Sequence, residues 1–298
     1  MILHTRPRQV GPSAHMLLRS AGALAAALLL LATLASGIWA QQGPGQSSGA
    51  LTPLQRKIER ERRRLSSSDE EERRDAVMRL GSMKRAESSR AAVRALSDDS
   101  VIVRATAARA VLSLPGEEAA SALLALLQDR DEFVRRETAY AIGETRSRAG
   151  VQPLIALLLN DKESSVRAAA AVALGQLGDE TAAAPLSDSL SRRVRGSGLL
   201  SKVRRSKEPE NEFVRRAAAR SLGQIGSRVG VPALISTLSD EGSGDDVRRE
   251  AARALGLIAD PAAIPALRGV LTARDPYLSR LAYEALLRIA PAEATRPA

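Results

Sequence analysis

The feature that most constrains this chain is a ten-residue motif that recurs at nearly constant spacing. The clearest copies begin at Val134, Val166, Val214 and Val247 and read approximately Val-Arg-x-x-Ala-Ala-x-Ala-Leu-Gly. Weaker copies begin at positions 72, 103 and 278, so the seven starts are separated by 31, 31, 32, 48, 33 and 31 residues. A fixed period of this size is typical of chains in which each repeat buries its apolar face against its neighbours.

Each copy follows a second apolar run, such as residues 122–127 or 151–159. Apolar residues recur at steps of three and four in both segments, which indicates two helices per repeat. Pro153, Pro232 and Pro265 fall near the start of the first helix, where a missing amide hydrogen is tolerated. Four copies close on a glycine, which serves either as a helix terminator or as space for close packing: Gly143, Gly175, Gly223 and Gly256.

The order Leu-Leu…Asp…Val-Arg…Ala-Ala…Ala-Leu-Gly resembles the HEAT repeat, in the short form found in bacterial HEAT-like proteins and phycobilin lyases. The resemblance extends over roughly residues 54–290. It implies an all-α fold, a right-handed α-solenoid of about seven antiparallel helix pairs. In that family the second helix of each pair lines the concave face.

An Asp and an Arg six residues apart recur in three successive repeats: Asp98 and Arg104, Asp129 and Arg135, Asp161 and Arg167. We expect the Asp to cap the following helix and the Arg to reach turn carbonyls and carboxylates of neighbouring repeats. Such a ladder would fix the register between repeats. The alternative is a row of anion-binding arginines. Both partners are absent from the last copy, as is typical of a terminal capping repeat.

The chain divides into an N-terminal targeting segment and one repeat domain. Residues 1–40 combine three arginines, no acidic residue and an uncharged run from Ala21 to Ala40, which predicts a cleaved secretory signal or an uncleaved signal anchor. Residues 41–52 read as a flexible linker, 53–290 as the solenoid and 291–298 as a tail. The protein is therefore expected to be exported, either periplasmic or secreted, or anchored in the inner membrane with the solenoid outside the cytoplasm.

Composition narrows the chemistry that the repeat domain can perform. The chain has no Cys, and its two His are His4 and His15. A zinc site with His or Cys ligands, a Cys nucleophile and a Ser-His-Asp triad are therefore excluded after residue 15. Aromatic residues make up only 2% of the chain, which argues against stacking on nucleobases. We predict no catalytic residue, no cofactor and no metal.

The long step between the fourth and fifth copies is a basic insertion, residues 191–210. The formal net charge of the chain is +10. Three of these charges precede residue 41, and residues 191–207 of the insertion contain seven basic residues and no acidic one, so the rest of the chain is balanced. The seven are Arg192, Arg193, Arg195, Lys202, Arg204, Arg205 and Lys207. The insertion is either a contact for an acidic protein or anionic lipid, or a tolerated solvated loop.

The second helices offer a candidate binding surface. Counting from the first residue of the motif, positions 0, 4, 5 and 8 are apolar, and positions 2, 3 and 6 are expected to face outward into the concave groove. Arginine and tyrosine are enriched in interface anchors. We predict partner-binding residues at Arg109, Arg136, Tyr140, Arg216, Arg220, Arg249 and Arg253. The alternative is that these arginines are ordinary solvated surface.

These observations favour a non-catalytic protein–protein interaction scaffold whose Arg-rich concave groove binds a protein partner, which could be acidic. The alternative is a lyase or an enzyme-associated protein, by analogy with the phycobilin lyases. Fold resemblance transfers function poorly, however. Nucleic-acid binding is a third hypothesis, and the signal segment and the scarcity of aromatic residues argue against it.

Overall fold

The computed structural model describes residues 51–195 and 207–294, and the described residues from Pro53 onward form one compact unit. The predicted signal segment, the linker up to residue 50, the end of the predicted tail, and Lys202, Arg204 and Arg205 of the basic insertion lie outside the described residues. In the described ranges, no helix has the length and apolar character needed to cross a membrane.

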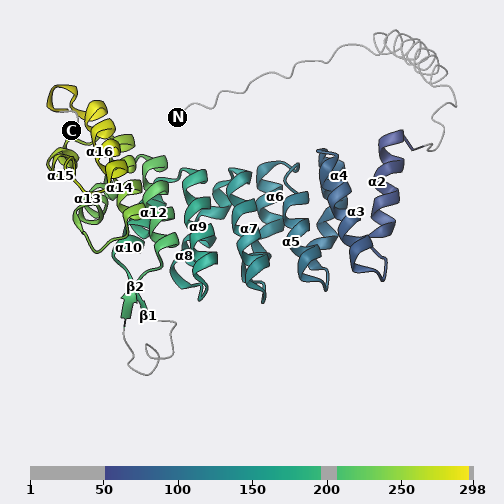
Figure 1. The fold of residues 1–298 in the computed structure, drawn as a ribbon. Helices are drawn as coiled ribbons and strands as arrows, with labels where there is room; N and C mark the ends of the chain where they lie inside the picture. Colours follow the sequence, from purple (N-terminus) through teal and green to yellow (C-terminus); the bar gives the residue numbers. More distant parts are fainter. Residues whose placement is uncertain (1–50, 196–206, 295–298) are drawn as a thin grey trace, which may run out of the picture. The chain divides into compact units, whose positions relative to one another are not determined.

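The described residues fold into seven consecutive helix pairs (Figure 1). Most first members contain a 3-10 turn, labelled η. The first members are α2 (Pro53–Arg64), α4 (Ala86–Ala92) with η2 (Val93–Ser97), α6 (Gly116–Leu123) with η3 (Leu124–Gln128), η4 (Arg148–Gly150) with α8 (Val151–Asn160), η5 (Glu180–Ala182) with α10 (Ala183–Ser191), η6 (Arg228–Gly230) with α13 (Val231–Ser239), and η7 (Pro261–Ala263) with α15 (Ile264–Gly269). The second members are α3 (Glu70–Ser82), α5 (Val101–Ala110), α7 (Glu132–Thr145), α9 (Ser164–Leu177), α12 (Glu212–Ile225), α14 (Asp245–Ile258) and α16 (Pro276–Ile289). A last 3-10 turn, η8 (Pro291–Glu293), follows α16.

Local sequence signals place the ends of the second helices. Ser100 and Asp131 accept hydrogen bonds from backbone amides of the first turns of α5 and α7, and Asp275 does the same for α16. Residues in the left-handed conformation end α9 and α12, namely Gly178 at φ 67° and Gly226 at φ 75°. The helix starts therefore lie within a few residues of the positions that the repeat motif predicts.

Two layers of helices make the array. Each second helix contacts the next along the series α3, α5, α7, α9, α12, α14 and α16, and first helices such as α10, α13 and α15 contact one another in the other layer. The buried apolar residues form one continuous cluster along the array. This arrangement confirms the predicted all-α solenoid, in which each pair buries its apolar face against its neighbours.

The glycines that close the motif provide space for close packing. They lie inside the last turn of their helices, and the residues that end those helices come three residues later. A Cβ added at Gly143 would lie 2.8 Å from the Cα of Ala173, and one at Gly256 would lie 2.9 Å from the Cα of Ala285. The glycines therefore let consecutive second helices approach backbone to backbone.

The insertion between α10 and α12 begins and ends as a β-hairpin. β1 (Arg193–Arg195) pairs antiparallel with β2 (Lys207–Pro209), with Val194 opposite Glu208. The amide of Glu210 donates a 2.9 Å hydrogen bond to the carbonyl of Arg192, which extends the pairing by one step. The two strands join the insertion to the turn between the helices of the fifth pair.

One detail of the predicted pattern is wrong. Position 3 of the motif was expected to face outward, but Ala169, Ala217 and Glu250 at this position are buried. Ala105, at position 2, is buried as well. Consecutive second helices pack so closely that this side of each helix is covered by the neighbouring repeat. The solvent-facing surface is therefore narrower than the pattern indicated.

Candidate functional site

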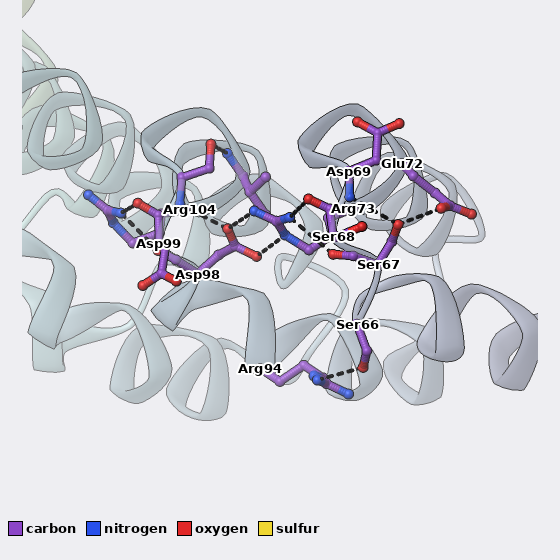
Figure 2. Close-up of polar contacts among 12 residues, drawn as sticks. Ser66, Ser67, Ser68, Asp69, Glu72, Arg73, Arg94, Asp98, Asp99 and Arg104 are labelled. Carbon is purple, nitrogen blue, oxygen red and sulfur yellow. Dashed lines mark hydrogen bonds and ion pairs between the residues drawn. The ribbon is translucent and has the colours of Figure 1, made fainter.

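A ladder of arginine–carboxylate pairs runs along the turns within the helix pairs. Arg73 donates from Nε and Nη2 to the two carboxylate oxygens of Asp98, at 2.8 and 2.9 Å, and from Nη1 to the carbonyls of Ser67 and Ser68 (Figure 2). Arg104 makes the same four bonds one repeat later, with Asp129 as the carboxylate. Each arginine therefore ties its own turn to the turn of the next repeat.

The same geometry continues through the next two steps. Arg135 holds Asp161 at 2.7 and 3.1 Å, and Arg167 holds Glu210 at 3.0 and 2.6 Å. Glu210 is the last residue of the basic insertion, and its side chain is fully buried. It was not predicted, because nothing in the motif marks a carboxylate 43 residues after its arginine.

The role expected for the ladder aspartates needs one correction. Asp98 and Asp129 do not cap the following helix; each accepts instead from the amide two residues further on, at 2.9 Å, and that residue is the cap. Burial acts to raise the pKa of both carboxyls, but the hydrogen bonds from the arginines and these amides outweigh it. The net pKa of each lies below its ordinary value. The arginines and carboxylates are engaged with one another, so the ladder is structural.

The face of the second helices that lies away from the ladder carries most of the predicted binding residues. We call it the second-helix face; it consists of the exposed or half-buried side chains at positions −1, 2 and 6 of the motif. Two cavities open on it, one of about 420 Å³ over the first three pairs and one of about 610 Å³ over the last three. The first is lined by Arg74, Met78, Ile102, Thr106, Arg109, Phe133 and Glu137, among others.

The C-terminal cavity brings four of the predicted arginines together: Arg216, Arg220, Arg249 and Arg253. Arg249 is held by two carboxylates, at 2.6 Å from Asp275 and 2.8 Å from Asp246. The hydrogen bonds that Arg249 donates to these carboxylates, above all to Asp275, raise the pKa of Arg249 above its ordinary value. Arg216 lies 3.3 Å from Asp246. Acidic residues that the groove prediction did not include therefore hold these arginines in place.

Glu250 links the other two arginines of this cavity. Arg220 donates to its Oε1 at 2.9 Å, and Arg253 lies 3.8 Å from its Oε2, which is an ion-pair distance but too long for a hydrogen bond. Oε2 is buried and has no hydrogen-bond partner among the described residues. Arg220 and Arg253 are each more than half exposed, so their guanidinium groups remain accessible from the cavity.

The other three predicted residues of the groove are not part of this cluster. Arg109 lines the N-terminal cavity and lies 3.7 Å from Glu144. Arg136 pairs with Glu137 at 3.3 Å, and Tyr140 is half-buried; neither lines either of the two cavities. The predicted set therefore divides into a C-terminal cluster and a more dispersed N-terminal part.

Three aromatic residues at position −1 were missed by the sequence analysis. Arg136 lies over the ring of Phe133 at 5.0 Å, and Arg216 over Phe213 at 5.3 Å. Arg249 lies over the ring of Tyr277 in the next repeat, at 5.2 Å. These are cation–π distances. The signal was available, because each aromatic stands directly before the Val or Leu that starts a motif copy.

The structure describes only part of the predicted basic loop. Arg192 is half-buried and donates to the carbonyl of Leu158 at 3.4 Å, and Arg193 is exposed. Arg195 and Lys207 are described in their backbone alone, as the inner ends of the two strands. Within the described residues, no group of three or more His, Cys, Asp or Glu side chains is arranged to hold a metal ion.

The fold places the protein in the class of all-α solenoids built from antiparallel helix pairs. A family model for HEAT repeats matches residues 62–143, 121–197 and 197–288. The chain therefore belongs to the HEAT repeat family. No match was found among curated protein sequences.

The chain is also similar in fold to several solved structures. The X-ray structure of the Escherichia coli protein YibA has a TM-score of 0.55 at 21% identity, over 79% of this chain and 81% of that chain. The CpcE–CpcF complex of phycocyanin lyase from Nostoc sp. gives 0.46 at 23%, over 84% and 92%. A designed armadillo repeat protein gives 0.40 at 19%, over 78% and 99%. At these identities the likeness concerns the fold alone.

Proposed function

We propose that this protein is an exported, non-catalytic scaffold that binds a protein partner on the second-helix face. The single observation that carries the proposal is the row of arginine–aromatic pairs on that face, next to two cavities. HEAT repeats are repeat scaffolds, and extended surfaces of stacked repeats are suited to holding a partner along several repeats.

The exposure of the aromatic rings supports this role. The residues Phe213 and Tyr277 are 63% and 65% exposed, although large apolar side chains usually gain by burial. One side of each ring faces an arginine, and much of the remaining surface is open to solvent. Rigid aromatic rings beside arginines are the composition of interface hot spots, because they lose little conformational entropy on binding.

The charge on this face favours an acidic partner segment. Five arginines and three acidic residues line the C-terminal cavity, so it is cationic overall. Arg249 is fixed by its ion pairs, and Arg220 and Arg253 remain more than half exposed. A carboxylate of the partner would meet guanidinium groups that are already positioned, which reduces the entropy lost on binding.

Crosslinking from single positions tests the proposal. A photoreactive amino acid placed at Phe213 or Tyr277 of the full chain, in the cells that make the protein, should crosslink to one discrete partner. Val229 is the matched control, because it is also a large apolar residue, 55% exposed, but lies in η6 of a first helix. Equal crosslinking from Val229, or none from the two aromatic positions, would contradict the proposal.

Export is the second part of the proposal, and it rests on the basic and apolar pattern of residues 1–40. Fusing a reporter enzyme that is active only outside the cytoplasm to the C-terminus tests it. An active fusion supports export, and an inactive but intact fusion contradicts it. The mass of the mature chain then separates cleavage from anchoring.

The basic insertion would add a second contact, with an acidic protein surface or anionic lipid. The support is the concentration of seven basic residues in one segment whose ends are held as a hairpin. Replacing Lys202, Arg204 and Arg205 by Gln leaves the hairpin base intact. Flotation with anionic and with neutral vesicles should then show salt-sensitive binding that the variant loses. Equal flotation of variant and wild type would remove the lipid contact from the proposal.

A further inference from the structure

The hydrogen-bond partners of the ladder arginines change immediately after the insertion. At the first four steps, each arginine has one carboxylate from the next turn. At the fifth step, Arg215 donates from the same two atoms, Nε and Nη2, but to other groups. Its Nε donates to the carbonyl of Leu190 at 2.9 Å, and its Nη2 donates to the hydroxyl of Ser243 at 2.6 Å. Two neutral oxygens therefore replace the carboxylate.

Asp240 interacts electrostatically with two arginines of this part of the ladder. Asp240 accepts from the Ser243 hydroxyl at 2.7 Å, so it reaches Arg215 only through that hydroxyl. Both Arg215 and Arg248 act electrostatically on Asp240, and Arg248 is itself bonded to a backbone carbonyl, that of Leu238. Among the described residues, neither Arg215 nor Arg248 therefore has a directly bonded carboxylate, whereas each earlier ladder arginine has one.

A cavity lies at this point. It has a volume of about 540 Å³ and is bounded by the end of α10, the hairpin base, the start of α12 and the end of α13. Its charged lining residues are Arg192, Arg193, Arg215 and Asp240. Nη1 of Arg215 has no partner among the described residues, whereas Nη1 of each earlier ladder arginine donates to two carbonyls. The cavity is thus cationic and contains a half-buried guanidinium with unused donors.

We propose that this cavity is an oxyanion-binding site, in which a carboxylate or phosphate group of a ligand supplies the charge that Asp98, Asp129, Asp161 and Glu210 supply at the earlier steps. Arg215 is the central donor, and Arg192 and Arg193 border the same cavity from the hairpin base. The site lies along the ladder, away from the second-helix face, so it does not depend on the partner proposed there. Charge-assisted hydrogen bonds from arginine to either oxyanion are the strong kind of polar contact.

Thermal unfolding of the full chain in acetate or inorganic phosphate, compared with chloride at equal ionic strength, tests the site. A ligand that binds only the folded state raises the midpoint in a concentration-dependent way. The anion with the stronger effect identifies the group that the site prefers. Equal midpoints in all three salts would overturn the proposal.

Two variants locate the effect. Arg215→Gln removes the central donor and should weaken the apparent anion affinity by about tenfold, the effect of losing one hydrogen bond to a charged group. Arg215→Gln also alters the ladder, so Arg192→Gln with Arg193→Gln provides a second test at the hairpin base. Arg228→Gln is the matched control, since Arg228 is 80% exposed and lies outside the cavity. Unchanged anion affinity in the Arg215 variant and in the double variant would overturn the assignment.

Discussion

Replacing Arg135 by Met should destabilise the solenoid far more than replacing a surface arginine that makes equally good hydrogen bonds. Arg135 holds Asp161 through two hydrogen bonds, and its side chain and that of Asp161 are 9% and 5% exposed. Met has a similar length but cannot donate. The change would leave a buried carboxylate without its cation and remove the bonds from Nη1 to two turn carbonyls.

The magnitude follows from burial. Removing one partner of a buried ion pair costs about 3–5 kcal/mol, because the remaining charge stays desolvated. Arg90 and Glu118 form the control pair, with the same two-bond geometry at 2.8 and 2.8 Å but with side chains 53% and 41% exposed. An exposed pair of this kind contributes at most about 1 kcal/mol. Arg90→Met should therefore be nearly neutral.

Urea unfolding followed by circular dichroism measures both variants, because the signal reports helices along the whole array. The stability of a repeat array is a sum of unit and interface terms, so a weakened interface in the middle should also broaden or split the transition. Adding Asp161→Asn to the Met variant removes the orphaned charge and should recover part of the loss. A loss below about 1 kcal/mol for Arg135→Met, equal to that of Arg90→Met, would refute the reasoning that burial decides the value of the pair.

Two further predictions concern pH and close packing. The folded pKa values of Asp98, Asp129 and Asp275 lie below their ordinary value; burial opposes this shift for Asp98 and Asp129, and the hydrogen bond from Arg249 is its main cause for Asp275. Their contribution is therefore complete above the unfolded value of about 3.9 and is lost as the pH falls through the lower folded values. The melting temperature should therefore fall as the pH drops below about 4, and less steeply in Asp129→Asn. A pH profile of the variant that matches the wild type would contradict this. Gly143→Ala should destabilise by about 1–3 kcal/mol, because the added methyl group meets the backbone of Ala173, whereas Gly269→Ala, with nothing within 4 Å, should be neutral or slightly stabilising. Similar losses from the two alanine variants in urea unfolding would argue against the packing role.

The repeat motif predicted the architecture because periodicity and packing agree in every copy. The same local signals recur in each repeat and agree with the packing of the whole array. They are the starts of the seven copies, the prolines at the first helices and the arginines of the ladder. The reading of position 3 as exposed was wrong because it considered each helix alone. Ala169 and Glu250 are covered by neighbouring repeats, and single-helix periodicity carries no information about how closely the next helix packs.

The binding residues were only partly accessible to sequence reasoning. The four arginines of the C-terminal cavity were predicted as part of a set of seven residues that share motif positions, and the structure brings these four together. Their acidic partners come from other helices or other positions, as when Arg249 of α14 reaches Asp275 at the start of α16. Glu210 is a stronger case, since the length of the insertion hides its equivalence to the ladder aspartates. Such pairings depend on three-dimensional register rather than on spacing along the chain.

At the fourth step of the ladder Glu210 stands where the earlier steps have an Asp, and this affects which sequence changes the protein can accept. The insertion closes on a hairpin and ends in the residue that continues the ladder, so the repeats on either side are joined as if no extra segment were present. The contacts that join these two repeats therefore come from residues outside the segment between the two strands. The segment can be lengthened, recoded or exchanged for a foreign peptide, and the junction at Arg167 and Glu210 would still set the pitch of the stack. The segment between β1 and β2 is therefore a suitable place to insert a new peptide without redesigning the rest of the molecule.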